Sequence, residues 1–286
     1  MKTRIISGIV MGVIVAAVLS LGFIWNPIVI NIAVALLAAG AVYELTHTVA
    51  KIKSKLALVG ACVYAFFGTF IMLETAVDTP MYLSLSSYWG RFENLKFGLL
   101  YLFILTVAYF IYSAVLVLKN LKDMTLATIV TLCALPLFVI GGFSCLGNVI
   151  NNQNGIYYLL LLFNFSCVCD MGAYFVGVTI GKHKLCPNIS PKKTVEGAVG
   201  GIVSSIIVTV ILTLCFSKPM LLPMILTIPL CVLGMIGDLF ASSIKRTVDL
   251  KDYGNLIPGH GGILDRLDSI LMISPLLYIL VQIGVI

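Results

Sequence analysis

Between residues 237 and 269 the chain carries an unusual density of side chains that could do chemistry. The segment reads GDLFASSIKRTVDLKDYGNLIPGHGGILDRLDS and contains five acids, several bases and a glycine turn. Asp238, Ser242 and Lys245 follow one another at spacings of four and three. A helix would therefore present a carboxylate, a hydroxyl and an ammonium on one face, which suits charged substrates and metal ions.

Two further carboxylates, Asp265 and Asp268, are three residues apart at the beginning of the last apolar run. They share one face if that run is helical. Carboxylates supplied by two helices form an oxygen-rich site that can hold Mg²⁺ and leave coordination positions for substrate phosphates. We therefore predict that Asp238, Asp265 and Asp268 bind Mg²⁺, and we leave open whether a monovalent cation joins it.

The remaining polar residues of this segment suit the recognition of phosphate. Arginine can clamp two phosphate oxygens at once, and glycines let backbone N–H groups approach a phosphate closely. An inner loop whose acids and bases only pair with one another is the alternative for any single residue, but it explains the whole set poorly. We predict catalytic roles for Lys245, Arg246, Asp252, His260 and Arg266, and substrate-binding roles for Ser242, Lys251, Gly261 and Gly262.

A second polar segment, DMGAYFVGVTIGKHKLCPNISPKKTVEG, occupies residues 170 to 197. Its basic half leads into a helix expected to begin near Thr194, and a helix amino terminus beside lysines is a natural phosphate site. Topology signals or contacts with anionic lipid heads explain the same lysines equally well, and Glu196 in a first turn is also ordinary capping chemistry. We predict that Lys192 and Lys193 bind substrate and that Asp170 and Glu196 are catalytic.

The composition indicates what surrounds these polar residues. Of the 286 residues, 60% are hydrophobic and only 10% are charged, against about a quarter charged in an ordinary soluble domain. A membrane span needs about 20 consecutive, mostly apolar residues. We predict an all-α integral membrane protein with about nine spans, at residues 5–25, 27–48, 56–73, 97–118, 124–147, 156–180, 195–216, 221–243 and 264–286.

The distribution of basic residues gives these spans an orientation. With a cytoplasmic amino terminus, all of the 18 lysines and arginines except Arg91, Lys96 and Lys218 fall in inner segments or at their edges. This is the asymmetry that the positive-inside rule requires of short loops. Topology therefore explains the net charge of +6 without a nucleic-acid partner, and it places both polar segments on the cytoplasmic side of the cell membrane.

Acidic residues inside the predicted spans point to a shared cavity. An ionisable residue in a span is costly, so it usually faces a partner or a water-filled space. Asp170, Glu196 and Asp238 each fall in the cytoplasmic half of a span, and we expect them to line one cavity that opens inward. For Glu44, which lies close to His47 and the lysines of the first inner loop, we expect a structural or snorkelling role.

The chain shows no internal repeat and no long linker, so separate soluble domains are not expected. The useful division is functional. Residues 1–150 are predicted to be scaffold helices, and residues 151–286 are predicted to form the catalytic region with its active site facing the cytoplasm.

The two polar segments resemble the phosphatidate cytidylyltransferase family, also called CDP-diacylglycerol synthases. The family's signature is similar to S-x-x-K-R, four residues, K-D, then P-x-H-G-G and D-R-x-D, and this chain has every element in one register. The resemblance covers about residues 160 to 270, with Met171 standing where a threonine is expected. The matching residues are Ser242, Lys245, Arg246, Lys251, Asp252, Pro258, His260, Gly261, Gly262, Asp265, Arg266 and Asp268, and upstream Asp170, Ala173, Tyr174, Phe175, Gly177, Ser190, Pro191, Lys192, Lys193, Thr194, Glu196 and Gly197.

The resemblance implies a reaction in which CTP and phosphatidic acid give CDP-diacylglycerol and pyrophosphate with the help of Mg²⁺. Both substrates are polyanions, so catalysis should rest on holding them in line and neutralising their charge. The nucleophile is itself a phosphate oxygen, largely ionised near neutral pH because its second pKa is about 6. No strong general base is therefore required. The implied partners are CTP and membrane phosphatidic acid, and a homodimer is left open.

Three other membrane proteins compete with this interpretation. A CTP-dependent kinase of a lipid alcohol would also need a cytoplasmic nucleotide site, but the complete signature argues against it. An ion-coupled transporter would place polar residues on both sides of the midplane, whereas these lie inward. A CDP-alcohol phosphotransferase would show a DG…AR…G…D…D pattern, which we do not find in this sequence.

Overall fold

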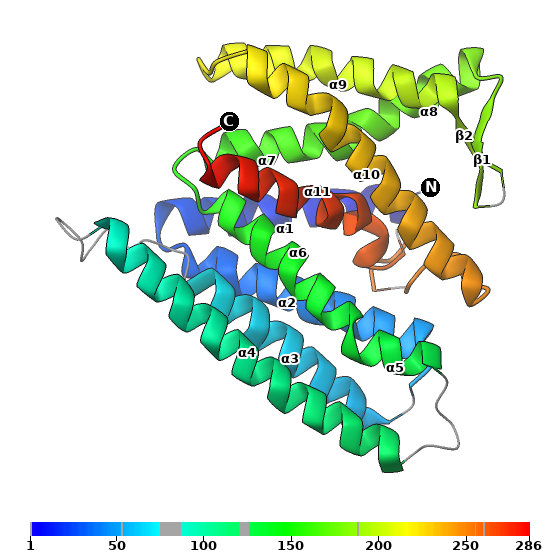
Figure 1. Ribbon diagram of the computed structural model, residues 1–286. Helices are drawn as coiled ribbons and strands as arrows, with labels where there is room; N and C mark the ends of the chain where they lie inside the picture. The colour runs from blue at the N-terminus through cyan, green and yellow to red at the C-terminus, as the bar shows by residue number, and fades with distance from the viewer. Residues whose placement is uncertain are drawn as a thin grey trace. The chain divides into compact units, whose positions relative to one another are not determined.

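The computed structural model is almost entirely helical, and it describes residues 2–52, 54–74, 87–119, 126–187, 189–254, 256–259 and 261–286 (Figure 1). The predicted site residue His260 lies outside these ranges. In chain order the elements are α1 (Lys2–Ile24), α2 (Ile28–Glu44), the π-helical turn η1 (Leu45–Val49), α3 (Lys55–Glu74), α4 (Ser87–Lys119), α5 (Leu126–Cys133), α6 (Leu135–Ile150), α7 (Gly155–Phe163), the π-helical turn η3 (Asn164–Val168), α8 (Cys169–Ile180), β1 (Lys184–Cys186), β2 (Ser190–Thr194), α9 (Val195–Cys215), α10 (Leu221–Thr247) and α11 (Leu264–Gln282).

Eight stretches of helix within the described residues are long and apolar enough to cross a membrane. They confirm the predicted all-α membrane class. The predicted ninth span, 264–286, forms α11, which is not among the eight and begins with charged residues, namely Asp265, Arg266 and Asp268. The ninth span and the orientation of the chain stay predictions.

The described chain forms two compact units. Unit 1 consists of Met1–Asn151 and Asp252–Asp265, and unit 2 consists of Asn152–Lys251 and Arg266–Ile286. One boundary lies beside the predicted division at residue 150. The segment from residue 252 to residue 265, which the sequence analysis groups with the catalytic region, packs instead with the amino-terminal helices.

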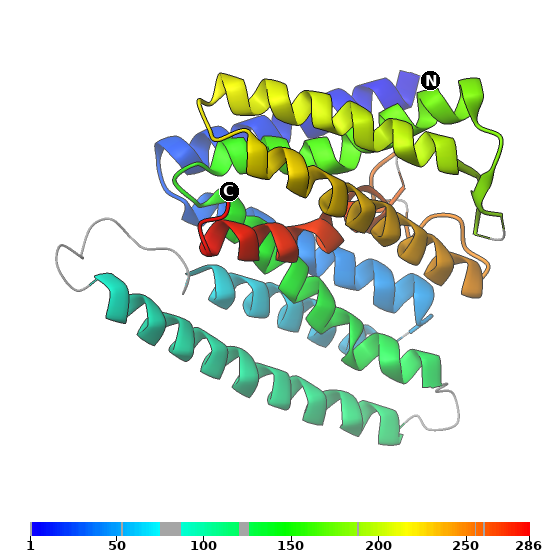
Figure 2. The same cartoon turned by 45° about the horizontal axis from the view of Figure 1, so that its top comes forward.

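Unit 1 is built around α2, α3 and α6, and α4 runs along α3 in both views (Figures 1 and 2). The face of α2 toward its neighbours carries small residues, and Ala35, Ala38 and Ala41 are fully buried. Small side chains let helix backbones approach closely, which matters in a membrane because lipid is as apolar as leucine. Between α3 and α4, Tyr64 stacks on Tyr109 with ring centroids 4.2 Å apart.

Unit 2 brings α8 and α9 together through glycines. A Cβ atom at Gly201 would lie 2.5 Å from the carbonyl oxygen of Cys169, and one at Gly197 would lie 2.6 Å from that of Ala173. These two glycines are four residues apart on one face of α9, the spacing at which membrane helices make their closest contacts. The contact fixes Asp170, in the first turn of α8, relative to the beginning of α9.

A buried polar network ties the π-helical turn η3 to α9 and α10. The side-chain amide of Asn164 donates to the carbonyl oxygen of Ser205 at 3.0 Å and to Thr209 Oγ1 at 2.9 Å. Thr209 in turn is hydrogen-bonded to Thr227 at 2.8 Å. Hydrogen bonds between membrane helices add directional contacts to packing. They hold the helix that leads into Asp170 against the helix that leads toward Asp238.

The glycine contact of unit 2 predicts a specific loss of stability. In Gly201→Ala the new methyl group meets backbone oxygen, so we expect the free energy of unfolding to fall by about 1–3 kcal/mol. The matched control is Gly141→Ala in α6, where a Cβ would meet nothing within 4 Å. Thermal unfolding of both variants in detergent measures the difference. Equal unfolding temperatures for the two variants would contradict the close contact of α8 and α9.

Candidate active site

Unit 2 gathers three carboxylates from three different helices. Asp170 of α8, Asp238 of α10 and Asp268 of α11 lie near enough to one another to interact electrostatically. Two lysines offset their mutual repulsion. Lys193 forms an ion pair with Asp238, and the buried Lys245 interacts with Asp268. The structure therefore brings five of the predicted site residues together in one charged cluster.

The predicted polar face of α10 is present in the structure. Asp238, Ser242 and Lys245 all lie within α10, so their spacings of four and three place them on one face of the helix. Ser242, one turn after Asp238, is half-buried on this helix. α10 continues to Thr247, past the predicted end of the span at residue 243, and this extension keeps the three residues on one continuous helix.

A cavity of about 430 Å³ lies beside this cluster and is lined by residues of unit 2. Its polar lining includes Asp170, Asp238 and the lysines of the strand β2. Its apolar lining includes Tyr174 and Val178 of α8, both of which are exposed. The cavity thus combines a charged end with an apolar flank on a membrane-length helix.

A two-stranded hairpin delivers the lysines to the cavity. β1 and β2 are antiparallel, with Lys184 opposite Thr194 and Cys186 opposite Ser190. The two strands were not predicted from the sequence, which indicated only the helix that follows them. Lys193, the residue before Thr194, is half-buried and points to Asp238, while Lys192 is exposed and lines the cavity.

Thr194 joins the hairpin to α9, as the sequence predicted. It is the N-cap residue of α9, and its side-chain oxygen accepts a hydrogen bond from the backbone N–H of Gly197 at 3.1 Å. The cap satisfies one of the N–H groups that every helix leaves unpaired at its beginning. It also fixes the direction in which β2 enters the helix, and with it the place of Lys193.

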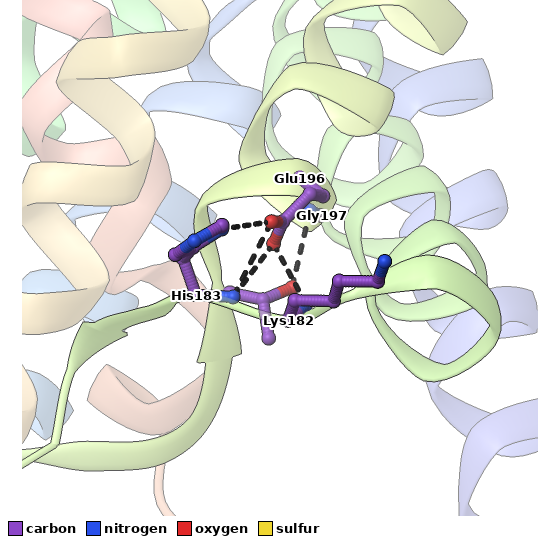
Figure 3. A network of polar contacts seen from close by, with 5 residues as sticks. Lys182, His183, Glu196 and Gly197 are labelled. Carbon is purple, nitrogen blue, oxygen red and sulfur yellow. Dashed lines mark hydrogen bonds and ion pairs between the residues drawn. The ribbon is translucent and has the colours of Figure 1, made fainter.

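Glu196 turns toward Lys182 and His183 at the base of the hairpin (Figure 3). Its carboxylate accepts hydrogen bonds from the backbone N–H of Lys182 at 3.0 Å and of His183 at 3.1 Å, and it lies 2.5 Å from Nδ1 of the His183 ring. The contact anchors the chain before β1 to the first turn of α9. A catalytic role for Glu196 stays a prediction, and the anchoring of His183 was not anticipated from the sequence.

Arg246, Lys251 and Arg266 are exposed, unlike the buried Lys245. The guanidinium of Arg246 donates to the carbonyl oxygen of Leu250 at 3.0 Å and so closes the turn after the helix. Substrate contacts of Arg246, Lys251 and Arg266 stay predictions.

Unit 1 contains the glycine turn and Asp265. The carboxylate of Asp265 accepts hydrogen bonds from the backbone N–H of Tyr253 at 2.8 Å and of Gly262 at 3.0 Å. Gly261 has a φ of +85°, a conformation that favours glycine. The N–H of Gly262 is therefore engaged by Asp265 in this structure, although the sequence analysis expected it to bind phosphate. Asp252 is exposed at the beginning of this segment.

Glu44 has the structural one of the two roles expected from the sequence. It is only 1% exposed, and its carboxylate accepts hydrogen bonds from the backbone N–H groups of Ile263 and Leu264. Its burial excludes the alternative, a snorkelling side chain. Its partners are 219 and 220 residues away in the chain, so the sequence alone could not identify them.

The donor set of unit 2 can be tested for its fit to Mg²⁺. Within the described ranges, no three His, Cys, Asp or Glu side chains are close enough to hold a metal ion as they stand. The cluster nonetheless supplies carboxylate oxygens, which are the ligands that Mg²⁺ prefers. Lys193 takes one oxygen of Asp238. The residues therefore fit Mg²⁺ in kind.

Comparisons with known proteins place these features in a family. The model of the "Cytidylyltransferase family" matches residues 2–284. The chain is similar to the phosphatidate cytidylyltransferase of Bacillus subtilis (strain 168), with 42% identity over 135 residues, which cover 45% of this chain and 49% of that protein. It is also similar to the enzymes of that name from Staphylococcus saprophyticus, with 42% identity, and Staphylococcus aureus (strain COL), with 39%; each match covers 130 residues, 45% of this chain and 50% of the relative. The chain spans about half the length of the curated relatives it matches.

The ion pair of the cluster predicts energetic coupling between Lys193 and Asp238. Each of the variants Lys193→Met and Asp238→Asn removes one charge and leaves the other unpaired among apolar helices. We expect the double variant to lose less free energy of unfolding than the two single variants added together, by about 1 kcal/mol or more. Chemical unfolding in detergent, without nucleotide or Mg²⁺, measures this coupling.

The control for this cycle replaces Lys193→Met by Lys184→Met. Lys184 is exposed on β1, opposite Thr194, and has the same charge within the same hairpin. Its loss should add to that of Asp238→Asn without coupling. Additive effects in the Lys193 cycle as well would show that the ion pair does not contribute to stability.

Proposed function

Because the chain belongs to the cytidylyltransferase family, we propose that it transfers the cytidylyl group of CTP to phosphatidic acid, giving CDP-diacylglycerol and pyrophosphate. The observation that carries this proposal is the pairing of Lys193 with Asp238 at the charged end of a cavity with an apolar flank. The substrates match these two features of the cavity. CTP is a polyanion, and phosphatidic acid joins a phosphate to apolar acyl chains.

The proposed reaction is a displacement at the α-phosphorus of CTP. An oxygen of the phosphatidate phosphate forms the new P–O bond, and the bond between the α-phosphorus and the bridging oxygen to the β-phosphate breaks, so that pyrophosphate leaves with the electron pair. The attacking oxygen is already ionised near neutral pH. The chain must therefore supply alignment and positive charge rather than a base.

Lys193 is the residue of this chain best placed to receive a phosphate. Its ammonium is paired with Asp238 in the structure, and a phosphate group can replace the carboxylate as its partner if a cation such as Mg²⁺ takes over Asp238. Lys192 lines the same cavity beside it. We propose that entry of the substrate moves Lys193 from Asp238 to a phosphate oxygen, and that this exchange releases the Asp238 carboxylate.

We propose that the released carboxylate of Asp238 then becomes available to bind Mg²⁺. Asp238 and Asp268 of unit 2 are the carboxylates of the cluster that we propose for Mg²⁺, and Asp170 adds a further carboxylate beside Asp238. The sequence motif that contains Asp265 gives the same proposed role to that residue. Mg²⁺, when bound, neutralises charge on the phosphates. Lys245, held near Asp268, limits the repulsion among the acids.

The membrane-length helices give the lipid a way to reach the site. Tyr174 and Val178 belong both to the cavity wall and to the exposed side of α8. We propose that the head group enters the cavity past this flank while the acyl chains stay in the bilayer. The site would face the cytoplasm of the cell, where CTP is available and where the positive-inside rule places the hairpin lysines.

Labelled CTP distinguishes the proposed reaction from its rival. The purified full chain in detergent is incubated with phosphatidic acid, Mg²⁺ and CTP labelled at either the α- or the γ-phosphate. We expect the α-label in lipid and the γ-label in pyrophosphate. Incorporation of the γ-label into a lipid alcohol would instead indicate a CTP-dependent kinase, and no labelled lipid from folded protein would reject the enzyme.

A charge-matched pair of variants tests the cluster in the same assay. We expect Asp238→Asn to lower the rate of lipid labelling by at least about 100-fold, because it removes a proposed metal ligand and the partner of Lys193. Asp249→Asn is the control, since it removes the same charge from an exposed position just beyond α10. Similar rates for both variants would place the chemistry away from Asp238.

A further inference from the structure

The carboxylate of Glu44 lies in a setting that requires partners. Glu44 is the last residue of α2, within a stretch apolar enough to cross a membrane, and it is 1% exposed. A buried carboxylate without hydrogen bonds is strongly destabilising. The structure supplies two donors, and both come from the other end of the chain.

Glu44 caps the beginning of α11. Its Oε1 accepts a hydrogen bond from the N–H of Ile263 at 2.8 Å, and its Oε2 accepts one from the N–H of Leu264 at 3.0 Å. The first N–H groups of a helix have no partner within the helix, and Ile263 carries no side-chain oxygen that could serve as an N-cap. The negative charge also suits the positive end of the helix dipole.

Two glycines make room for this carboxylate. A Cβ atom at Gly262 would lie 2.4 Å from Oε2 of Glu44, and one at Gly254 would lie 3.0 Å from Oε1. Any side chain at Gly262 would push the carboxylate out of its place. A glycine at position 262 is therefore required by the structure, whether or not this turn binds phosphate.

The same turn holds Asp265. Its Oδ2 accepts the N–H of Gly262, the residue directly before the two that donate to Glu44. It also accepts the N–H of Tyr253 from the beginning of the segment. Three consecutive backbone N–H groups are thus divided between two carboxylates, so the orientation of Asp265 depends on the place of Glu44.

We propose that Glu44 is a positioning residue that holds the first turn of α11 and thereby fixes the carboxylate of Asp265 for the reaction. The part of this inference that concerns the reaction rests on the proposed function. The part that concerns Asp265 rests only on the contacts within unit 1. Glu44 itself touches neither substrate nor metal in this account.

Hydrogen exchange tests the cap directly. In Glu44→Gln one acceptor oxygen is replaced by an amide group that faces an N–H, so the cap is lost. We expect amide exchange of Tyr253 and of residues 262–264 to become faster by about tenfold, as for other lost caps. Glu74→Gln is the control, because Glu74 ends α3, is exposed and accepts one hydrogen bond from Asn31. It should leave this exchange unchanged.

Kinetics separate positioning from a general structural effect. We expect Glu44→Gln to lower kcat for CDP-lipid formation by about tenfold or more with little change in the KM for CTP, because a misplaced Asp265 affects the transition state more than nucleotide binding. Glu44→Asp keeps the charge but is one methylene shorter, so it should behave like Glu44→Gln. Wild-type kcat in Glu44→Asp would mean that only the charge matters and would overturn the proposal.

The remaining outcomes are also decisive. Unchanged exchange in Glu44→Gln overturns the cap, and faster exchange with wild-type kcat overturns the link to the reaction. Should Glu44→Gln fail to fold, Gly254→Ala disturbs the same carboxylate more gently and should give the same changes to a smaller degree. If the wild-type chain forms no CDP-lipid, the proposed function fails, and exchange at Tyr253 and Gly262 alone decides whether Glu44 holds Asp265.

Discussion

The ion pair of Lys193 and Asp238 is the contact on which the candidate site depends. A carboxylate among membrane-length helices is costly without an opposite charge, and removing one member of such a pair leaves the other uncompensated. The two residues come from different elements, β2 and α10. Lys193 reaches Asp238 only because the cap of Thr194 and the contacts of Glu196 fix the hairpin to α9.

The same pairing suggests how a polyanionic substrate is accepted. A phosphate that enters the cavity can take the place of the carboxylate on Lys193, so the lysine keeps an anionic partner during binding. Under the proposed function this exchange also makes Asp238 available to Mg²⁺. In unit 1, Glu44 and Asp265 follow a related principle, because each carboxylate is held by backbone N–H groups at the beginning of α11.

The sequence predicted the helical membrane class and the start of α9 at Thr194, because apolar runs and capping residues are local signals. It also predicted the shared face of Asp238 and Lys245, which follows from helical spacing. It did not predict the hairpin, whose strands are too short to show alternation, or the turn of Glu196 toward His183. It predicted a structural role for Glu44 but not the partners, because the two N–H donors are distant in the chain and backbone groups cannot be recognised from residue type.

The central claim is that substrate phosphate replaces Asp238 as the partner of Lys193. An experimental structure of the full chain with Mg²⁺ and a non-hydrolysable CTP analogue measures this directly, through the distances from Lys193 Nζ to Asp238 and to the nearest phosphate oxygen. We predict that Lys193 lies within hydrogen-bond distance of a phosphate oxygen and has moved away from Asp238. A bound nucleotide with the Lys193–Asp238 pair intact would contradict the account.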